Sequence, residues 1–197
     1  MERYGGVMLS KRELRDVVNI GIALTTEKDK NRLLEMILWK AMQISNCDAG
    51  TLYLYKNEVL EFKIMKTLSQ NVSRGENGEK IELPSVRMLE ENVCAYAAIH
   101  REMVNIEDVY YSDRFDFNGP KKYDAITGYR TKSMLVIPMA DAEDELVGVL
   151  QLMNAQDENG EIVSFTEDDE FVLRSMSSQA AVCISNMKYI EEIKMQL

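Results

Sequence analysis

Apolar residues recur every three or four positions near both ends of the chain. This spacing predicts an amphipathic helix over residues 10–26, a second helix over 31–45 and a long closing helix from about Thr166. Each of these helices has an apolar face that must be covered. We therefore expect the first and last helices to pack together.

The middle of the chain changes to a period of two. Residues 48–68 and 132–156 alternate or form short apolar runs, which predicts two β-hairpins. The polar segment 69–85 contains two glycines and a proline, and we expect it to be a loop. After it we expect a helix over 86–98 and a short strand over 102–106.

A long segment, residues 107–131, is aromatic and rich in turn-forming residues, which predicts a functional loop with one short helix. Helices and hairpins are segregated along the chain, so the predicted fold class is α+β, with a central antiparallel sheet of about six strands flanked by helices. We expect an N-terminal helix over 1–27, a sheet domain over 28–187 and a C-terminal helix over 188–197.

Composition and charge exclude several classes of partner. The 197 residues are 46% hydrophobic, enough for one good core. The net charge of −10 is spread along the chain, which argues against binding nucleic acid or an anionic membrane. No apolar stretch reaches the roughly 18 residues of a membrane span. Cys47, Cys94 and Cys183 form no CxxC pair, which favours free thiols in a reducing cytoplasm.

Residues suited to catalysis or metal binding are sparse. His100 is the single histidine, so we expect no metal, haem or bilin site. The acids Glu167, Asp168, Asp169 and Glu170 are expected to occupy the first turn of the closing helix, where negative charge meets the positive end of the helix dipole. We therefore expect a protein that is not an enzyme.

Two long motifs and one short signature carry a family resemblance. The motifs are "MVNIEDVYYSDRF" and "DAITGYRTKSMLVIPM". The signature begins at Asn154 and continues, after a gap, with Phe165, Asp169 and Glu170 in the spacing Phe-x3-Asp-Glu. Over roughly residues 30–187 the chain resembles the GAF domain, the small-molecule sensor module of cyclic-nucleotide phosphodiesterases, bacterial cyclases and signalling regulators.

The resemblance implies a structural role for the signature residues. Phe165 is expected to be packed, and Asp169 is expected to accept hydrogen bonds that tie the final helix to the sheet. Ala155 stands where the family has a lysine that is thought to bond this aspartate. Asp169 must therefore find another donor, with Arg130 or a backbone N–H as candidates.

The resemblance also implies a ligand pocket. In the family, positions resembling Asp124, Thr127 and Thr131 contact the ligand, and backbone N–H groups at Val93 and Cys94 face it. Hydroxyl and carboxylate groups suit the phosphate and ribose of a nucleotide. In the alternative interpretation, Asp124 and Thr127 only satisfy the turn and Thr131 faces the sheet.

Met65 and Phe117 complete the candidate site. Met65 and Lys66 stand where cyclic-GMP binders carry an aromatic residue and an acid, so the sequence does not support guanine specificity. Phe117, with Phe115, is suited either to cover a purine or to pack in the core. Asn92 stands where the family's helix start has its first glycine.

These features predict a regulatory sensor that binds a small molecule, with a cyclic nucleotide as one candidate. The terminal helices would form a homodimer and carry the signal to an output domain. The likeness is closest to GAF domains that precede bacterial HD-type phosphohydrolase or diguanylate cyclase output domains. The alternative is a ligand-free dimerisation module whose pocket is filled by its own side chains, namely Met65, Met103, Phe117 and Met134.

Overall fold

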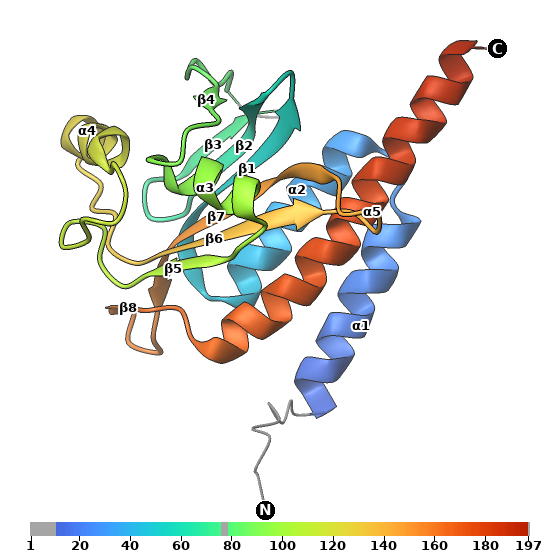
Figure 1. Cartoon of the computed structure of the whole chain (residues 1–197). Coiled ribbons are helices and arrows are strands. Elements are labelled where there is room, and N and C mark those ends of the chain that lie inside the picture. Colours follow the sequence, from blue (N-terminus) through green and yellow to red (C-terminus); the bar gives the residue numbers. More distant parts are fainter. Residues whose placement is uncertain (1–10, 76–78, 197) are drawn as a thin grey trace, which may run out of the picture.

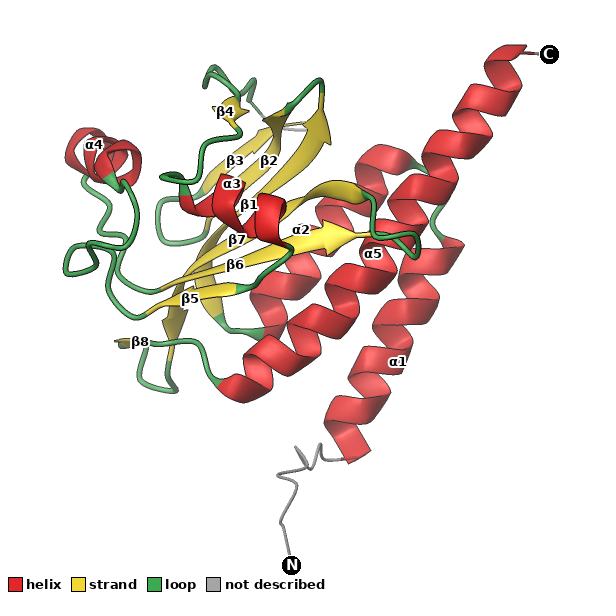
Figure 2. Cartoon of the chain, in the orientation of Figure 1, coloured by secondary structure: helices red, strands yellow, loops and turns green. Residues whose placement is uncertain are grey.

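The computed structural model describes residues 11–75 and 79–196 as an α+β fold with one antiparallel sheet (Figures 1 and 2). The main strands follow the order β3-β2-β1-β7-β6-β5, with β4 paired to β2 and β8 paired to β7. The strands are β1 (Cys47–Lys56), β2 (Val59–Thr67), β3 (Val72–Gly75), β4 (Val86–Arg87), β5 (Val104–Ile106), β6 (Met134–Ala140), β7 (Leu146–Gln156) and β8 (Ile162–Val163). The helices are α1 (Lys11–Thr26), α2 (Lys30–Ile44), α3 (Val93–His100), α4 (Asn118–Thr127) and α5 (Glu167–Gln196).

Helices cover both faces of the sheet. Helices α1, α2 and α5 lie together on one face, and α3 lies on the other, with α4 to one side (Figure 1). Strand β6 shows how the sequence encodes these layers. Leu135 and Ile137 pack in the core under α2 and α5, whereas Met134 and Val136 pack in the core under α3. Because both faces are buried, β6 reads as a continuous apolar run.

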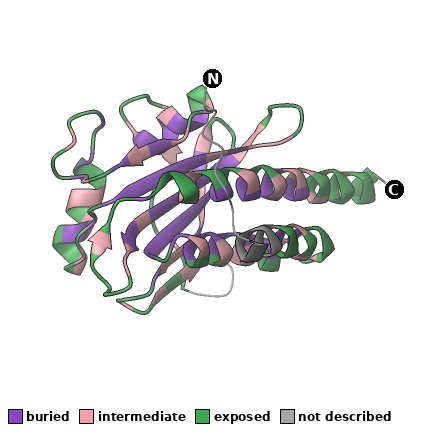
Figure 3. Cartoon of the chain, turned by 90° about the horizontal axis from the view of Figure 1, so that it is seen from below, coloured by how far each residue is buried: buried purple, intermediate pink, exposed green. Residues whose placement is uncertain are grey.

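The predicted packing of the terminal helices is confirmed. Ile20 and Leu24 of α1 are buried in the same core cluster as α5. The inner half of α5 is buried and its outer end is exposed (Figure 3). The first ten residues of the expected helix over 1–27 lie outside the described residues. None of the helices in the described part of the chain has the length and apolar character that a membrane crossing requires.

Three short strands were missed in the sequence. The predicted loop over 69–85 contains β3, and the predicted helix over 86–98 begins with β4. Helix α3 starts only at Val93. The sequence "VSRG" of β3 has no apolar alternation because this strand pairs through its backbone with the end of β2, where Thr67 lies opposite Val72. β8 is likewise held by pairing with the end of β7.

Candidate ligand-binding site

A partly open cavity of about 290 Å³ lies on the α3 side of the sheet. Its floor is formed by β1, β2 and β7, and its walls by the start of α3, by α4 and by the segment that leads into β4. Most of the lining is apolar or aromatic. The aromatic side chains are Tyr53, Phe62, Phe117, Tyr123 and Tyr129. Such walls suit a flat heterocyclic ligand.

A buried carboxamide lies on the floor of the cavity. Gln151 of β7 is only 7% exposed, and its Oε1 accepts a hydrogen bond of 2.9 Å from the hydroxyl of Tyr53. Its Nε2 contacts the thioether sulfur of Met134 at 3.3 Å, and a thioether is a weak acceptor. Burial raises the pKa of Tyr53 well above its ordinary value, which keeps the phenol a donor. The Gln151 amide therefore retains a donor for a ligand.

The start of α3 also opens onto the cavity. Val93 and Cys94 line it, as does the N-cap residue Asn92. The Oδ1 atom of Asn92 accepts hydrogen bonds from the backbone N–H groups of Cys94 at 2.9 Å and Ala95 at 3.2 Å. Of the two backbone donors that the resemblance offered to a ligand, Val93 and Cys94, the N–H of Cys94 is therefore paired within the chain. Burial raises the pKa of the Cys94 thiol to about 12, so this residue is a packing group rather than a nucleophile.

The charged groups of the cavity are few. Among the described lining residues there is one cation, Lys66, and one carboxylate, Asp116. Lys66 Nζ donates to the Ser73 hydroxyl at 3.2 Å. Met65, beside Lys66 on β2, lines the cavity, and so does Phe117.

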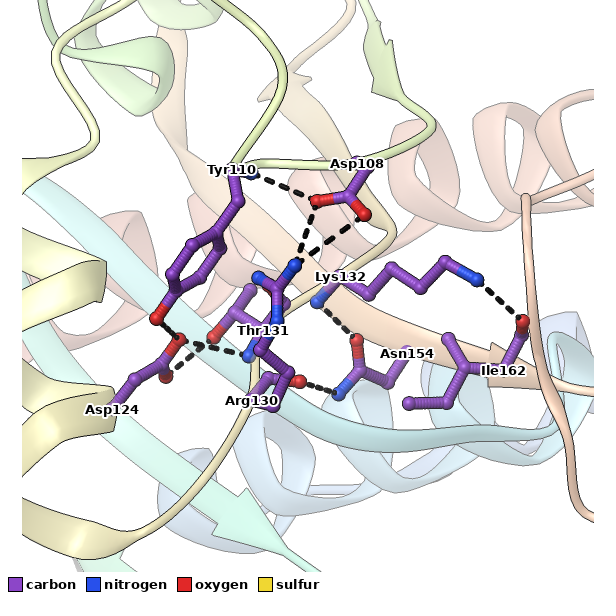
Figure 4. A network of polar contacts seen from close by, with 8 residues as sticks. All are labelled: Asp108, Tyr110, Asp124, Arg130, Thr131, Lys132, Asn154 and Ile162. Atoms are coloured by element: carbon purple, nitrogen blue, oxygen red, sulfur yellow. Dashed lines mark hydrogen bonds and ion pairs between the residues drawn. The ribbon is translucent and has the colours of Figure 1, made fainter.

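Of the three ligand contacts predicted near the start of β6, one lines the cavity and two do not. Thr131 lines the cavity, whereas Asp124 lies behind it, 3% exposed. Asp124 accepts hydrogen bonds of 2.9 Å from the backbone N–H and the hydroxyl of Thr131 and from the hydroxyl of Tyr110 (Figure 4). The Thr127 hydroxyl donates to the Tyr123 carbonyl at 2.8 Å and accepts from Tyr129 N–H at 3.3 Å. The structure thus places Asp124 and Thr127 in the last turn of α4, where both side chains bond the chain itself, and neither lines the cavity.

A stacked arginine covers the outside of this turn. The Arg130 guanidinium lies 3.4 Å from the centre of the Tyr110 ring. The same guanidinium pairs with Asp108 at 3.3 Å (Figure 4). The turn, the Tyr110 loop and the end of α4 are therefore fastened as one unit, which positions Thr131 and Tyr129 at the cavity.

Asn154 fastens the same turn to the sheet. It is 2% exposed, and its Oδ1 accepts from the Lys132 N–H at 2.7 Å (Figure 4). Its Nδ2 donates to the Tyr129 hydroxyl at 2.9 Å and to the Arg130 carbonyl at 2.8 Å. Its backbone has φ +59°, a left-handed conformation that asparagine tolerates better than most residues. Ala155, at the position of the family's lysine, is buried in the core beneath α2 and α5.

The other signature residues lie at the start of α5. Phe165 is 4% exposed in the main core. Asp169 does not form the expected tie to the sheet. Its Oδ2 accepts from the backbone N–H and the hydroxyl of Thr166, both at 2.8 Å, in a capping box at the start of the helix. The neighbouring Glu170 links the helix to the sheet, because its Oε1 accepts from Asn105 of β5 at 2.7 Å.

The alternative interpretation, a pocket filled by its own side chains, agrees only in part with the structure. Met65 and Phe117 line the cavity, and Met134 is fully buried in the core beneath it. Met103 packs instead against the core on the other face of the sheet. These side chains leave the volume of about 290 Å³ open.

A second, wider hollow of about 630 Å³ lies away from this cavity. It is formed by the β1–β2 turn, the end of α3 and the β6–β7 turn, and its lining mixes Arg87 and Arg101 with Glu58 and Glu145. The cavity beside α3 and α4 is the better ligand site because it combines aromatic walls with the buried Gln151 amide. Within the described residues, no three His, Cys, Asp or Glu side chains are grouped to hold a metal ion.

Comparisons with known proteins agree with this architecture. Residues 29–184 match the model of the GAF domain. A curated relative, the dual 3',5'-cyclic-AMP and -GMP phosphodiesterase 11A of Takifugu rubripes, is 40% identical over 96 residues, which is 49% of this chain and 10% of the relative. The dual 3',5'-cyclic-AMP and -GMP phosphodiesterase 11 of Drosophila melanogaster is 27% identical over 96% of this chain and 13% of its own length. This chain thus spans only a small part of these relatives.

A solved structure shows the same fold. The GAF domain from Acinetobacter phosphoenolpyruvate-protein phosphotransferase superposes with a TM-score of 0.69 and 18% identity, covering 93% of this chain and 99% of that one. At this identity the likeness concerns the fold alone. Because the family model spans most of the chain, the protein belongs to the GAF domain family, whose members are regulatory domains that sense small molecules.

Proposed function

We propose that this domain is a regulatory sensor whose ligand contains a purine and binds in the cavity beside α3 and α4. One observation carries the proposal: the cavity has aromatic walls and, on its floor, a buried Gln151 amide whose Nε2 contacts only a thioether among the described residues. A purine offers a flat ring for the walls and ring nitrogens that accept from this amide. The name of the Takifugu relative, a dual cyclic-AMP and -GMP phosphodiesterase, makes cyclic nucleotides the first ligands to test.

The charged residues of the cavity do not decide between adenine and guanine. The Lys66 ammonium and the Nε2 group of Gln151 donate to ring acceptors, which adenine offers at N1, N3 and N7 and guanine offers at O6, N3 and N7. The Watson–Crick edge of guanine also presents N–H donors, for which Asp116 on the lining carries an acceptor. We therefore expect both cyclic AMP and cyclic GMP to bind.

Calorimetric titration with cyclic AMP, cyclic GMP, adenosine and cytidine tests this proposal. The substitution Gln151→Leu keeps the bulk of the side chain and removes the amide. One lost hydrogen bond to a neutral group weakens purine binding by about 2- to 12-fold. Gln43→Leu, on the exposed side of α2, is the matched control and leaves the affinity unchanged. If no purine binds the wild-type protein, or if Gln151→Leu binds purines equally well, the proposal is wrong.

We also infer that the outer end of α5 forms a homodimer that carries the ligand signal. Ile184 is the last buried residue of α5, but Tyr189, Ile190 and Ile193 follow it with 53%, 52% and 59% of their surface exposed. Apolar side chains repeated along an exposed helix are typical of a helix–helix interface. Earlier in α5, Ala180 and Cys183 pack within the monomer, whereas Ile190 stays available to a partner.

Truncation after Met187 tests the dimer while leaving the buried part of α5 in place. We expect sedimentation analysis to show a smaller mass for the truncated chain, with an unchanged circular dichroism spectrum. The double substitution Ile190→Lys and Ile193→Lys should have the same effect, and Lys188→Glu at an exposed position is the control. An unchanged mass in both variants would exclude this interface.

A further inference from the structure

The N-terminal end of α3 lies at the wall of the cavity, and two of its backbone N–H groups are already bonded within the chain. A helix N-terminus is an anion-binding site because its first backbone N–H groups are free and its dipole favours negative charge. Here the Asn92 side chain accepts from the N–H groups of Cys94 and Ala95 at 2.9 and 3.2 Å. A neutral side-chain oxygen of the chain itself thus takes the place that a ligand oxygen would need.

The charged residues around this end of the cavity also disfavour a phosphate at the start of α3. Asp116 lines the cavity, its Oδ1 accepts from the Asn118 N–H at 2.9 Å, and its backbone N–H donates to the Glu91 carbonyl at 2.7 Å. This bond holds the Asp116 segment against the residue that precedes Asn92. The cation on the described lining, Lys66, lies on β2 and is bonded to Ser73 of β3. A phosphate at α3 would have to displace the Asn92 amide and lie near a carboxylate.

We propose that Asn92 is a specificity-determining residue that withholds the α3 N-terminus from the phosphate of the ligand. This inference rests on the proposed function and adds to it the ligand class that the site selects. The site recognises the purine and its sugar, through the aromatic walls and Gln151, and gains little from a phosphate. An uncharged purine nucleoside therefore binds about as tightly as the corresponding cyclic nucleotide.

The test compares a neutral and an anionic probe with the same base. Adenosine and cyclic AMP, and guanosine and cyclic GMP, are titrated into wild-type protein, Asn92→Gly and Asn92→Asp by calorimetry. Glycine is a tolerated N-cap that costs little stability and leaves both N–H groups free, whereas aspartate keeps the cap and adds a negative charge. Circular dichroism of each variant checks that α3 and the rest of the fold are retained.

In the wild-type protein we expect the affinities of nucleoside and cyclic nucleotide to agree within about threefold. In Asn92→Gly, the affinity for the cyclic nucleotide rises about tenfold, the effect of one hydrogen bond to a charged group, and the affinity for the nucleoside changes less than about twofold. In Asn92→Asp, the cyclic nucleotide binds more weakly and the nucleoside does not.

A different pattern overturns the inference. A wild-type preference of tenfold or more for the cyclic nucleotide would show that the phosphate is already recognised. Equal changes for both probes in Asn92→Gly would show that Asn92 only holds the helix. Should the glycine variant fail to fold, an unchanged ratio of the two affinities in Asn92→Asp decides against the inference. If neither probe binds any of the three proteins, the proposed function itself fails, and this inference with it.

Discussion

Substitutions at Asn154 can distinguish two contributions to stability: the hydrogen bonds of its side chain and the strain of its left-handed backbone. The side chain makes three hydrogen bonds to the turn, to the Lys132 N–H, the Tyr129 hydroxyl and the Arg130 carbonyl. The residue has φ +59°, so a substituted side chain must also tolerate a left-handed backbone. Alanine and glycine both remove the hydrogen bonds, but glycine relieves the strain.

The expected magnitudes follow from these contacts. Three neutral hydrogen bonds contribute about 1.5–4.5 kcal/mol to the free energy of unfolding, and the site is too buried for water to replace them all. Asn154→Ala loses this amount and adds about 1 kcal/mol for a left-handed alanine. We therefore expect Asn154→Gly to be more stable than Asn154→Ala by about 1 kcal/mol, although glycine usually destabilises a strand.

Urea unfolding followed by circular dichroism measures both differences. The control pair is Gln156→Ala and Gln156→Gly, near the end of the same strand, where φ is not positive and glycine should be the less stable of the two. If Asn154→Ala unfolds with a free energy within about 1 kcal/mol of the wild-type value, the side chain does not hold the turn, because three lost bonds must exceed this amount. If alanine is as stable as glycine at position 154, the left-handed backbone is not strained.

Three other substitutions test separate contacts by urea unfolding. Phe165→Ala should lower the free energy of unfolding by about 3–5 kcal/mol because the ring is buried in the main core, and a loss below 1 kcal/mol would contradict that packing. Thr131→Val removes the hydroxyl that donates to Asp124 and should cost about 1.5–3 kcal/mol, the contribution of a bond to a charged group; an unchanged midpoint would show that water replaces it. Ser177→Ala should stabilise the protein by about 1 kcal/mol, since the buried Ser177 hydroxyl has no hydrogen-bond partner among the described residues, and a loss of stability would reveal one.

The larger elements were predictable because their hydrophobic periods are long and regular. Leu33, Leu34, Ile37 and Leu38 give α2 a clear helical stripe, and all four are buried. Strand β4 has no such signal, since it is two residues long and exists through pairing of Val86 with Leu60. Elements that depend on a distant partner carry little information in their own sequence.

The candidate site was predictable only in part, because a motif identifies residues but not the partners of their side chains. Thr131 was found through its motif and lines the cavity, but the same motif could not show that Asp124 bonds Tyr110, fourteen residues earlier, in place of a ligand. Gln151 was missed, although a polar residue within the buried run "VGVLQLM" is a usable signal. Asn92 was noted as a departure from the family's glycine, but its role as a cap depends on side-chain geometry that only the structure gives.

Photochemical crosslinking tests the central claim, a purine site in the cavity beside α3 and α4, most directly. The probe is 8-azidoadenosine, irradiated with the wild-type protein and mapped by peptide mass spectrometry, with unlabelled adenosine as competitor. We predict that the label attaches to the aromatic residues of the cavity, Tyr53, Tyr123 and Tyr129, and that adenosine prevents it. Labelling at Tyr55, Leu89 or Ile99 in the wider hollow, or labelling that adenosine does not reduce, would contradict the account.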